Sequence, residues 1–309
     1  MTLSPFPVPE KAVWPGWVSD FWRIMVRIST RLPSFIYQLA LAFWSTRDDI
    51  YGLCMSDKRK RIVIKFGTGI LTKSSGNALN PRQLRRLTSE VAEIVHAGHQ
   101  CLLVSSGAVG AGLMLMGLSE RPKDLPSIQA CAAIGQSRLM RLYETFFQRH
   151  ELHVAQLLLS HQDIDSRTRY QNARNTLERL LRFQNVVPII NENDSVAVEE
   201  LRFGDNDSLS AEVAILAQAD LLLILTSVEG LLDQRKRLVE KVTDIDTVMH
   251  LASEEIGTYS TGGMATKLQA AKLAFQAGIP SVIASGLAPG VIAAVVGGKP
   301  AGTQILANK

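Results

Sequence analysis

Cysteine is scarce in this chain of 309 residues, which contains only Cys54, Cys101 and Cys131 and no C-x-x-C pair. An odd and scattered set argues against a disulfide framework and a zinc site, and it indicates a reducing compartment. The H-E-x-x-H pattern is absent as well, and the histidines form no cluster at ligand spacing. We therefore expect a cytoplasmic protein in which no side chains are dedicated to a metal ion.

Most of the chain has equal numbers of positive and negative side chains, although the net charge is +4. Residues 1–61 contain nine Lys and Arg against five Asp and Glu, and the remaining residues contain 24 of each kind. Nucleic-acid binding depends on clustered positive charge, which a neutral body does not offer. The composition therefore argues against a nucleic-acid partner.

Two common nucleotide-binding motifs are also missing. The sequence has no G-x-x-x-x-G-K-[ST], so the chain is not a P-loop enzyme. It has no G-x-G-x-x-G after a strand either, because Gly67-Thr68-Gly69 is followed by Ile70–Thr72. Dinucleotide binding is therefore unsupported.

The first 54 residues differ in composition from the rest. All four tryptophans lie there, and an apolar run follows at Phe35–Trp44. That run is half of the roughly 20 residues that a transmembrane helix needs, and no small-residue cleavage site of a signal peptide follows it. Two interpretations stay open: a peripheral amphipathic anchor that contacts a membrane, or a leader that is not translated because the protein starts at Met55. We therefore separate an N-terminal extension, residues 1–54, from a domain at residues 55–309.

From Met55 onward, short apolar runs alternate with amphipathic patterns. The predicted strands are Arg61–Phe66, Cys101–Val104, Val154–Leu159, Val186–Ile190, Leu221–Leu225 and Ser281–Ala284. One helix is predicted from Asn80-Pro81 to Gly98, and another starts after Ser105–Ala108. A long helix is predicted over Leu125–Arg149, and the last one over Met264–Ala277. Near-continuous apolar strands suit a parallel sheet covered on both faces. We expect an α/β fold, a doubly wound, mostly parallel sheet sandwiched by helices, with ligands at the carboxyl ends of the strands.

Five polar loops stand out among these elements. They are Lys65–Gly69, Ser105–Ala108, Asn191–Asp194, Gly204–Asp207 and Thr261–Lys267. A lysine at a strand end can reach a phosphate while glycine amides surround it, and the helix start after the second loop favours an anion. A solvated lysine and an ordinary N-cap are the alternative interpretations.

The last loop carries the strongest local signal. Lys267 falls in the first turn of a predicted helix, where the helix dipole favours acids over lysine. A lysine in that place suggests a phosphate partner. The two loops rich in acids and amides can hold a substrate ammonium or fix lysine side chains, although such loops are also common as turns.

In this order and spacing the loops resemble the amino acid kinase family, and within it the members that phosphorylate glutamate. The resemblance rests on KFGT, SSGA, INEND, GDND and TGGMATK, with AAIGQSRLM and NARNTL between them, and runs from about Met55 to about Thr303. It implies the amino acid kinase fold and transfer of phosphate from ATP, with Mg²⁺, to the side-chain carboxylate of L-glutamate. This reaction is the first step of proline biosynthesis. The resemblance also implies a homo-oligomer, either a dimer or a tetramer.

The resemblance assigns roles residue by residue. Lys65 and Lys267 flank the transferred phosphoryl group, and Asp207 orients both lysines. Glutamate is bound by Ser106, Asp194 and Asn206, and backbone donors come from Gly67 and Gly107. The residues that contact ATP are Lys65, Gly67, Thr226, Ser227, Thr261, Gly262, Gly263, Met264, Ala265, Thr266 and Lys267.

The chain departs from the family pattern in several places. Thr226-Ser227 stands where Thr-Asp is usual, Leu232–Val242 is short and lacks proline, and Gly69 stands where serine is common. The first two changes concern the nucleotide side. We expect no C-terminal RNA-binding-like domain, which many members add. Alternative functions are a kinase of another small acid, such as aspartate or N-acetylglutamate, and a regulatory relative without turnover.

Overall fold

The computed structural model describes residues 59–72, 78–118, 120–196, 206–254 and 263–307. The N-terminal extension, Thr261 and Gly262 lie outside the described residues. In chain order the elements are β1 (Arg61–Phe66), α3 (Thr68–Leu71), α4 (Pro81–His96), β2 (Gln100–Ser105), α5 (Ala108–Leu115), α6 (Leu125–Phe147), η1 (Gln148–His150), β3 (His153–Leu159), α7 (His161–Asp165), α8 (Arg167–Leu180), β4 (Val186–Glu192), α10 (Asn206–Leu216), β5 (Leu221–Thr226), β6 (Lys241–Val242), η2 (Ile245–Glu254), α11 (Met264–Gln276), β7 (Ser281–Ser285), α12 (Val291–Val296) and β8 (Thr303–Ile305).

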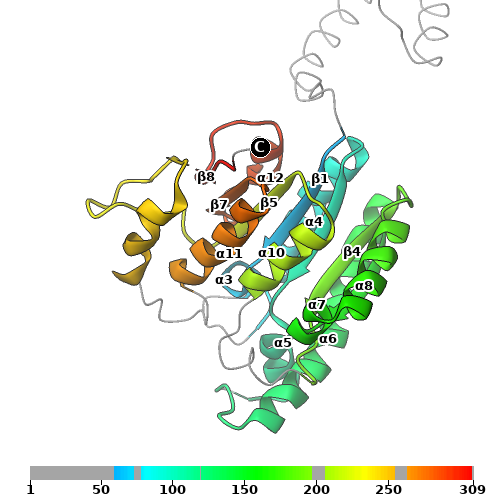
Figure 1. Ribbon diagram of the computed structural model, residues 1–309. Helices are drawn as coiled ribbons and strands as arrows, with labels where there is room; N and C mark the ends of the chain where they lie inside the picture. The colour runs from blue at the N-terminus through cyan, green and yellow to red at the C-terminus, as the bar shows by residue number, and fades with distance from the viewer. Residues whose placement is uncertain (1–58, 73–77, 119, 197–205, 255–262, 308–309) are drawn as a thin grey trace, which may run out of the picture. The chain divides into compact units, whose positions relative to one another are not determined.

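The strands form one sheet in the order β3-β4-β2-β1-β5-β7-β8-β6 (Figure 1). The first six of these strands run parallel, and β8 pairs antiparallel with β7. The predicted strands and the mostly parallel sheet are confirmed. The prediction that the helix at Met264–Ala277 is the last one is wrong, because α12 and β8 follow it. These late elements are short, and their pattern is too brief to stand out in the sequence.

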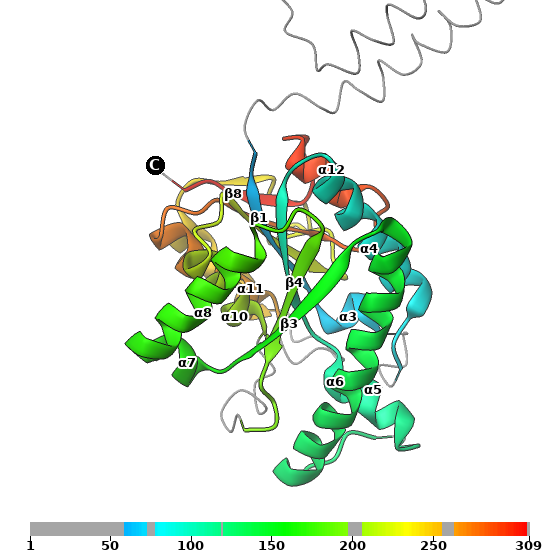
Figure 2. The same cartoon turned by 90° about the vertical axis from the view of Figure 1, so that its right-hand side faces the viewer.

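Two hydrophobic layers cover the sheet. The side chains of Ile62 and Ile64 pack on one face with α4, α6 and α12, whereas Val63 packs on the other face with α8, α10 and α11. This alternation is the two-residue period of a strand that is buried on both sides. Figure 2 shows α4 and α6 on one side of the strands and α8 and α11 on the other. The doubly wound sandwich that the sequence predicts is therefore present.

Helix ends follow the signals in the sequence. The Asn80 side chain accepts a hydrogen bond from the Gln83 amide at 3.2 Å, and Pro81 opens α4. Gly98 ends this helix with φ +94°, a left-handed conformation that glycine adopts without a Cβ penalty. Within the ranges described, every helix is too short or too polar to cross a membrane.

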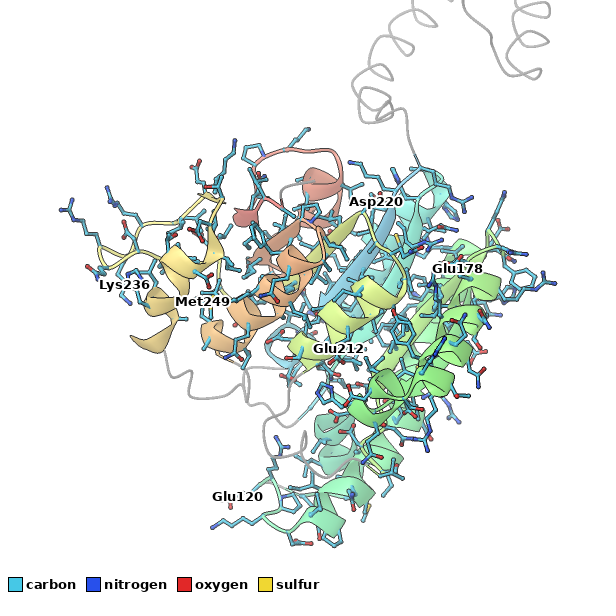
Figure 3. All side chains as sticks on the ribbon, in the orientation of Figure 1. Glu120, Glu178, Glu212, Asp220, Lys236 and Met249 are labelled. Carbon is cyan, nitrogen blue, oxygen red and sulfur yellow. The ribbon has the colours of Figure 1, made fainter. Side chains whose placement is uncertain are left out.

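The amino-terminal end of the sheet is held by Arg61. Its backbone amide donates to Asp220 at 2.8 Å, and its guanidinium donates to Glu178 at 2.6 Å and to Gln100 at 3.0 Å. Figure 3 shows Asp220 and Glu178 around this end of the sheet. Arg61 thereby links β1 to β2, α8 and the turn before β5. These contacts secure the register of the central strands and leave the opposite, carboxyl end for other groups.

Helices α5 and α6 touch through their backbones. A Cβ added at Gly135 would overlap the carbonyl oxygen of Ala108, and one added at Gly112 would overlap the carbonyl of Cys131. The two helices can therefore approach this closely only because both crossing positions are glycines. Since Ala108 is the first residue of α5, this contact also locates the loop that precedes the helix.

We predict that Gly135→Ala forces α5 away from α6. The free energy of unfolding should fall by about 1–3 kcal/mol, the usual range for overpacking. Urea denaturation of the purified variant checks this. The exposed neighbour Ala133, changed to serine, provides the matched control on the same helix, and equal stability of the two variants would contradict the close backbone contact.

Candidate functional site

The polar loops meet at the carboxyl edge of the sheet. Strands β4, β2, β1 and β5 are neighbours and run parallel, so their carboxyl ends lie together. Lys65 is the penultimate residue of β1, Asn191 lies near the end of β4, and Thr226 ends β5. Ser106 follows directly after β2. Open α/β sheets bind ligands at this edge.

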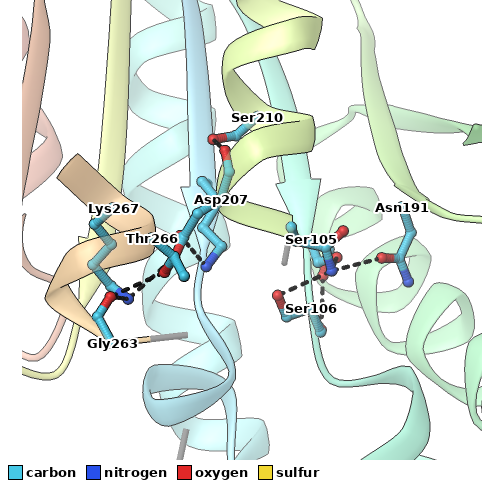
Figure 4. A network of polar contacts seen from close by, with 10 residues as sticks. Ser105, Ser106, Asn191, Asp207, Ser210, Gly263, Thr266 and Lys267 are labelled. Carbon is cyan, nitrogen blue, oxygen red and sulfur yellow. Dashed lines mark hydrogen bonds and ion pairs between the residues drawn. The ribbon is translucent and has the colours of Figure 1, made fainter. Parts of the chain in front are cut away.

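Two lysines share one carboxylate at the centre of this edge. Lys65 Nζ lies 2.5 Å from Asp207 Oδ1, and Lys267 Nζ lies 3.2 Å from Asp207 Oδ2 (Figure 4). All three side chains are buried, with 5%, 6% and 1% of their residues' surface exposed for Lys65, Lys267 and Asp207. The three residues come from β1, α10 and α11, more than 200 positions apart in the chain at the extremes. The predicted pairing of both lysines with Asp207 is thus observed.

The ionised form of Asp207 is favoured despite its burial. Burial by itself would raise the pKa of this carboxyl, but the charges of Lys65 and Lys267 and the hydrogen bond from Thr266 hold the pKa below its ordinary value. The Thr266 hydroxyl donates to Asp207 Oδ2 at 2.8 Å. In these two ion pairs, two ammonium groups face one buried carboxylate and outnumber it in charge. Such an excess is suited to an anionic ligand, which offsets the cost of keeping both charges out of water.

The start of α11 explains how a lysine is tolerated in a first helical turn. Lys267 Nζ donates to the Gly263 carbonyl oxygen at 3.2 Å, in addition to its contact with Asp207. Gly263 is the N-cap of α11, and its carbonyl also accepts from the Thr266 hydroxyl at 3.0 Å. The carboxylate of Asp207 thus compensates the unfavourable helix dipole at Lys267. The helix position of Lys267 predicts a phosphate partner, and the family resemblance predicts Asp207. The structure shows the contact with Asp207 and adds the Gly263 carbonyl.

A second polar cluster lies beside the lysines. The Asn206 side-chain amide donates to the Ser105 carbonyl, Ser106 Oγ and Asn191 Oδ1, each at 3.1 Å. Asn206 and Asp207 are consecutive residues in the first turn of α10, so one helix start serves both clusters. Figure 4 shows Ser106 and Asn191 beside the lysine cluster. The structure thus brings together the predicted substrate residues Ser106 and Asn206.

Glycines shape the two loops next to the clusters. Gly107 has φ +99° and is the N-cap of α5, a conformation that favours glycine. The Gly67 amide donates to the Leu225 carbonyl oxygen at 3.2 Å, and a Cβ at Gly67 would lie 3.1 Å from that oxygen. The predicted role of the Gly67 amide as a phosphate donor therefore does not fit this arrangement, because β5 already uses the amide. At Gly67 the backbone instead passes close to the carbonyl of Leu225, where a side chain would be crowded.

Several predicted residues lie at the edges of the site. Asp194 follows two residues after β4 and is half-buried, and Ser227 is exposed after β5. Met264 and Ala265 belong to the first turn of α11, where Met264 is buried and Ala265 exposed. The roles assigned to these four residues stay predictions.

Two departures from the family pattern lie side by side. A Cβ at Gly69 would lie 3.3 Å from Ser227 Oγ. Gly69 in α3 is therefore next to Ser227, the residue that follows β5. The third departure, the short loop Leu232–Val242, is closed on itself. Asp233 accepts from the Arg237 amide at 2.9 Å and from Arg237 Nε at 2.9 Å. Figure 3 shows Lys236 in this loop at the periphery of the domain.

Comparison with known proteins agrees with the geometry. The profile described as "Amino acid kinase family" matches residues 60–285. Glutamate 5-kinase of Moorella thermoacetica is 51% identical over 261 residues, covering 82% of this chain and 68% of the relative. Glutamate 5-kinase of Acinetobacter baumannii is 42% identical over 256 residues, covering 81% and 67%. The chain belongs to the amino acid kinase family, which confirms the resemblance read from its loops.

Solved structures share the fold at lower identity. Carbamate kinase from Giardia lamblia bound to AMP-PNP has a TM-score of 0.58 and 20% identity, and the match covers 82% of this chain and 100% of that one. UMP kinase from Bacillus anthracis has a TM-score of 0.53 and 17% identity, covering 81% and 97%. These likenesses confirm the predicted amino acid kinase fold.

Sequence reasoning missed part of the second cluster. Asn191 lies in a loop that stood out, but it received no role, and Gln136 lies in AAIGQSRLM on α6 without attracting attention. Asn191 Nδ2 donates to Gln136 Oε1 at 2.8 Å. A polar amide on a largely apolar stretch of a helix was the available signal, but helix spacing alone does not reveal which sheet edge it faces.

We predict that Lys267→Ala lowers kcat by roughly 10²–10³, the usual effect of removing one transition-state donor. The loss is expected because Lys267 supplies half of the positive charge around Asp207. Steady-state kinetics of phosphoryl transfer provide the measurement.

Lys272→Ala is the matched control for this variant. Lys272 lies on the same helix, but its ammonium pairs with the exposed Asp246 at 2.5 Å. Its kcat should equal that of the wild type. Unchanged turnover in Lys267→Ala would remove the role assigned to this lysine.

Proposed function

We propose that this chain is a glutamate 5-kinase, which transfers the γ-phosphoryl group of ATP to the side-chain carboxylate of L-glutamate. The products are γ-glutamyl phosphate and ADP, and the reaction opens proline biosynthesis. The observation that carries the proposal is the buried Lys65–Asp207–Lys267 cluster beside the amides of Asn191 and Asn206. The relatives named glutamate 5-kinase, at 42% to 51% identity over most of the chain, support the choice of substrate.

The chemistry of the reaction matches the residues present. A carboxylate acceptor is already ionised at neutral pH, so the reaction needs no general base. Phosphoryl transfer depends on positioning and on neutralising charge rather than on covalent help. Lys65 and Lys267 supply that charge from two sides, and Asp207 keeps both ammonium groups in place. The second cluster orients the amino acid so that its γ-carboxylate meets the phosphate.

We propose that Mg²⁺ enters with the nucleotide, as the MgATP complex. In the parts of the chain described, no group of three or more His, Cys, Asp and Glu side chains is arranged to hold a metal ion. Asp207, the buried carboxylate of the candidate site, already forms ion pairs with two lysines. Mg²⁺ is commonly bound through substrate phosphates with few protein ligands, and bound in that way it neutralises phosphate charge. Thr226 and the start of α11 stay our candidates for contacts with ATP.

The cellular setting is part of the proposal. We infer a cytoplasmic enzyme, because Cys101 and Cys131 are free thiols and disulfides are rare in the reducing cytosol. We also infer a homo-oligomer, which rests on the family resemblance.

Other kinases of small acids are the competing functions. Phosphorylation of aspartate or N-acetylglutamate would use the same lysines, because the transferred group is the same. Relatives named glutamate 5-kinase, at 51% and 45% identity, favour glutamate. A regulatory relative without turnover is disfavoured because Lys65 and Lys267 both contact Asp207. Asn206 is retained as well and contacts Ser106.

The substrate is tested with hydroxylamine, which converts an acyl phosphate into a hydroxamate. Purified protein with ATP and Mg²⁺ should form the hydroxamate with glutamate, and much less with aspartate or N-acetylglutamate. An ATP-free reaction is the control. Absence of product above this control would contradict the kinase activity, and a preference for N-acetylglutamate would contradict the choice of substrate.

The domain division is tested by truncation. A protein that begins at Met55 should fold and keep its activity with glutamate, because the contacts described above for the two clusters join residues beyond position 60. Circular dichroism and the hydroxamate assay provide the measurement. Aggregation or inactivity of the shortened protein would show that the N-terminal extension contributes to the domain.

A further inference from the structure

The side-chain amides near Ser106 form a network whose orientation is fixed by backbone groups. The Glu192 amide donates to Asn191 Oδ1 at 2.9 Å, so that atom must be the carbonyl oxygen of the side chain. Asn191 Nδ2 therefore points the other way and donates to Gln136 at 2.8 Å. An amide that receives this bond must present its oxygen, so Gln136 faces Asn191 with Oε1. The Nε2 group of Gln136 is thereby turned toward another side.

The same reasoning fixes the amide of Asn206. Its Nδ2 donates to the Ser105 backbone carbonyl, which can only accept. Oδ1 of Asn206 is therefore the atom on the opposite side of the amide. Both Gln136 Nε2 and Asn206 Oδ1 are buried, and neither has a hydrogen-bond partner among the residues that the structure describes.

A buried donor and a buried acceptor without partners are costly, each by an amount comparable to a lost hydrogen bond. Here they belong to residues linked through one intermediate, Asn191. An α-amino acid carries the complementary pair at its α-carbon, a carboxylate that accepts and an ammonium that donates. At its other end the network adjoins Asp207, which follows Asn206 in sequence and pairs with both lysines. In the proposed function the γ-carboxylate of the substrate lies near these lysines.

We propose that Gln136 is a substrate-binding residue whose Nε2 donates to the α-carboxylate of the amino-acid substrate, while Asn206 Oδ1 accepts from its ammonium. This inference rests on the proposed function. Gln136 then has two tasks: Oε1 positions Asn191, and Nε2 recognises a carboxylate rather than an amide at the α-carbon. Helix α6 thus contributes a specificity-determining group to a site otherwise made from strand ends and the start of α10.

The test is Gln136→Glu, because the two tasks respond differently to it. Glutamate keeps an oxygen that accepts from Asn191, so a purely structural role would survive. It loses the donor and places a negative charge beside the α-carboxylate. We expect KM for glutamate to rise by about 10–100-fold, as for a lost bond to a charged group, while KM for ATP stays within about twofold.

A second substrate sharpens the test. The α-amide of glutamate keeps the γ-carboxylate that is phosphorylated. Its amide N–H can donate a hydrogen bond to the carboxylate that Gln136→Glu introduces. The ratio of kcat/KM for glutamate over the α-amide should fall at least about tenfold in Gln136→Glu relative to the wild type, because specificity is a difference between two affinities. Gln148→Glu, the same charge change at the exposed end of α6, should leave this ratio unaltered.

The outcomes separate the inference from the proposed function. A wild-type protein that forms no product from glutamate contradicts the function itself. An active wild type with an unchanged ratio and unchanged KM in Gln136→Glu overturns the role of Gln136. If thermal unfolding shows that this variant does not fold, Gln136→Met replaces it: the donor is lost without added charge, and wild-type KM for glutamate in that variant overturns the inference equally.

Discussion

The whole site depends on one buried carboxylate that two lysines share. Asp207 lies between Lys65 at 2.5 Å and Lys267 at 3.2 Å, and it is the only group in that triad with negative charge. Without it, two buried ammonium groups would repel each other and lose their hydration. With it, both lysines have an opposite charge beside them, and in the proposed function they face a phosphate. In the proposed function, the same contact also positions both lysines for the transition state.

The fold serves this contact by joining distant parts of the chain. Parallel strands bring Lys65 and Asn191 to one edge, and α10 begins there with Asn206 and Asp207. Because these two residues are consecutive, the cluster of two lysines around Asp207 and the cluster of amides around Asn206 are neighbours. The Gly112–Gly135 crossing brings α6 close enough to place Gln136 against Asn191. In the proposed function, one set of packed elements therefore serves both substrate orientation and charge neutralisation.

Much of this could be predicted from the sequence, for identifiable reasons. Strands buried on both faces have continuous apolar runs, so β1, β2 and β5 were predictable, and so was the sheet edge carrying Lys65. The lysine in the first turn of α11 signalled an anion. By contrast, α12 and β8 are too short for a reliable pattern. The role of Gln136 depends on which amide faces which, and that follows from backbone partners at Glu192 and Ser105 that no spacing reveals. The Gly67 amide was predicted to be available, but pairing with Leu225 uses it.

The central claim is that Asp207 keeps both lysines in place while they neutralise the transferred phosphoryl group. A crystal structure with glutamate, ADP, Mg²⁺ and a planar metal fluoride that mimics this group measures it directly. We expect Lys65 Nζ and Lys267 Nζ each to lie within hydrogen-bond distance of the fluoride group and of Asp207. A structure in which either lysine points away from the fluoride, or in which both leave Asp207, would contradict the account.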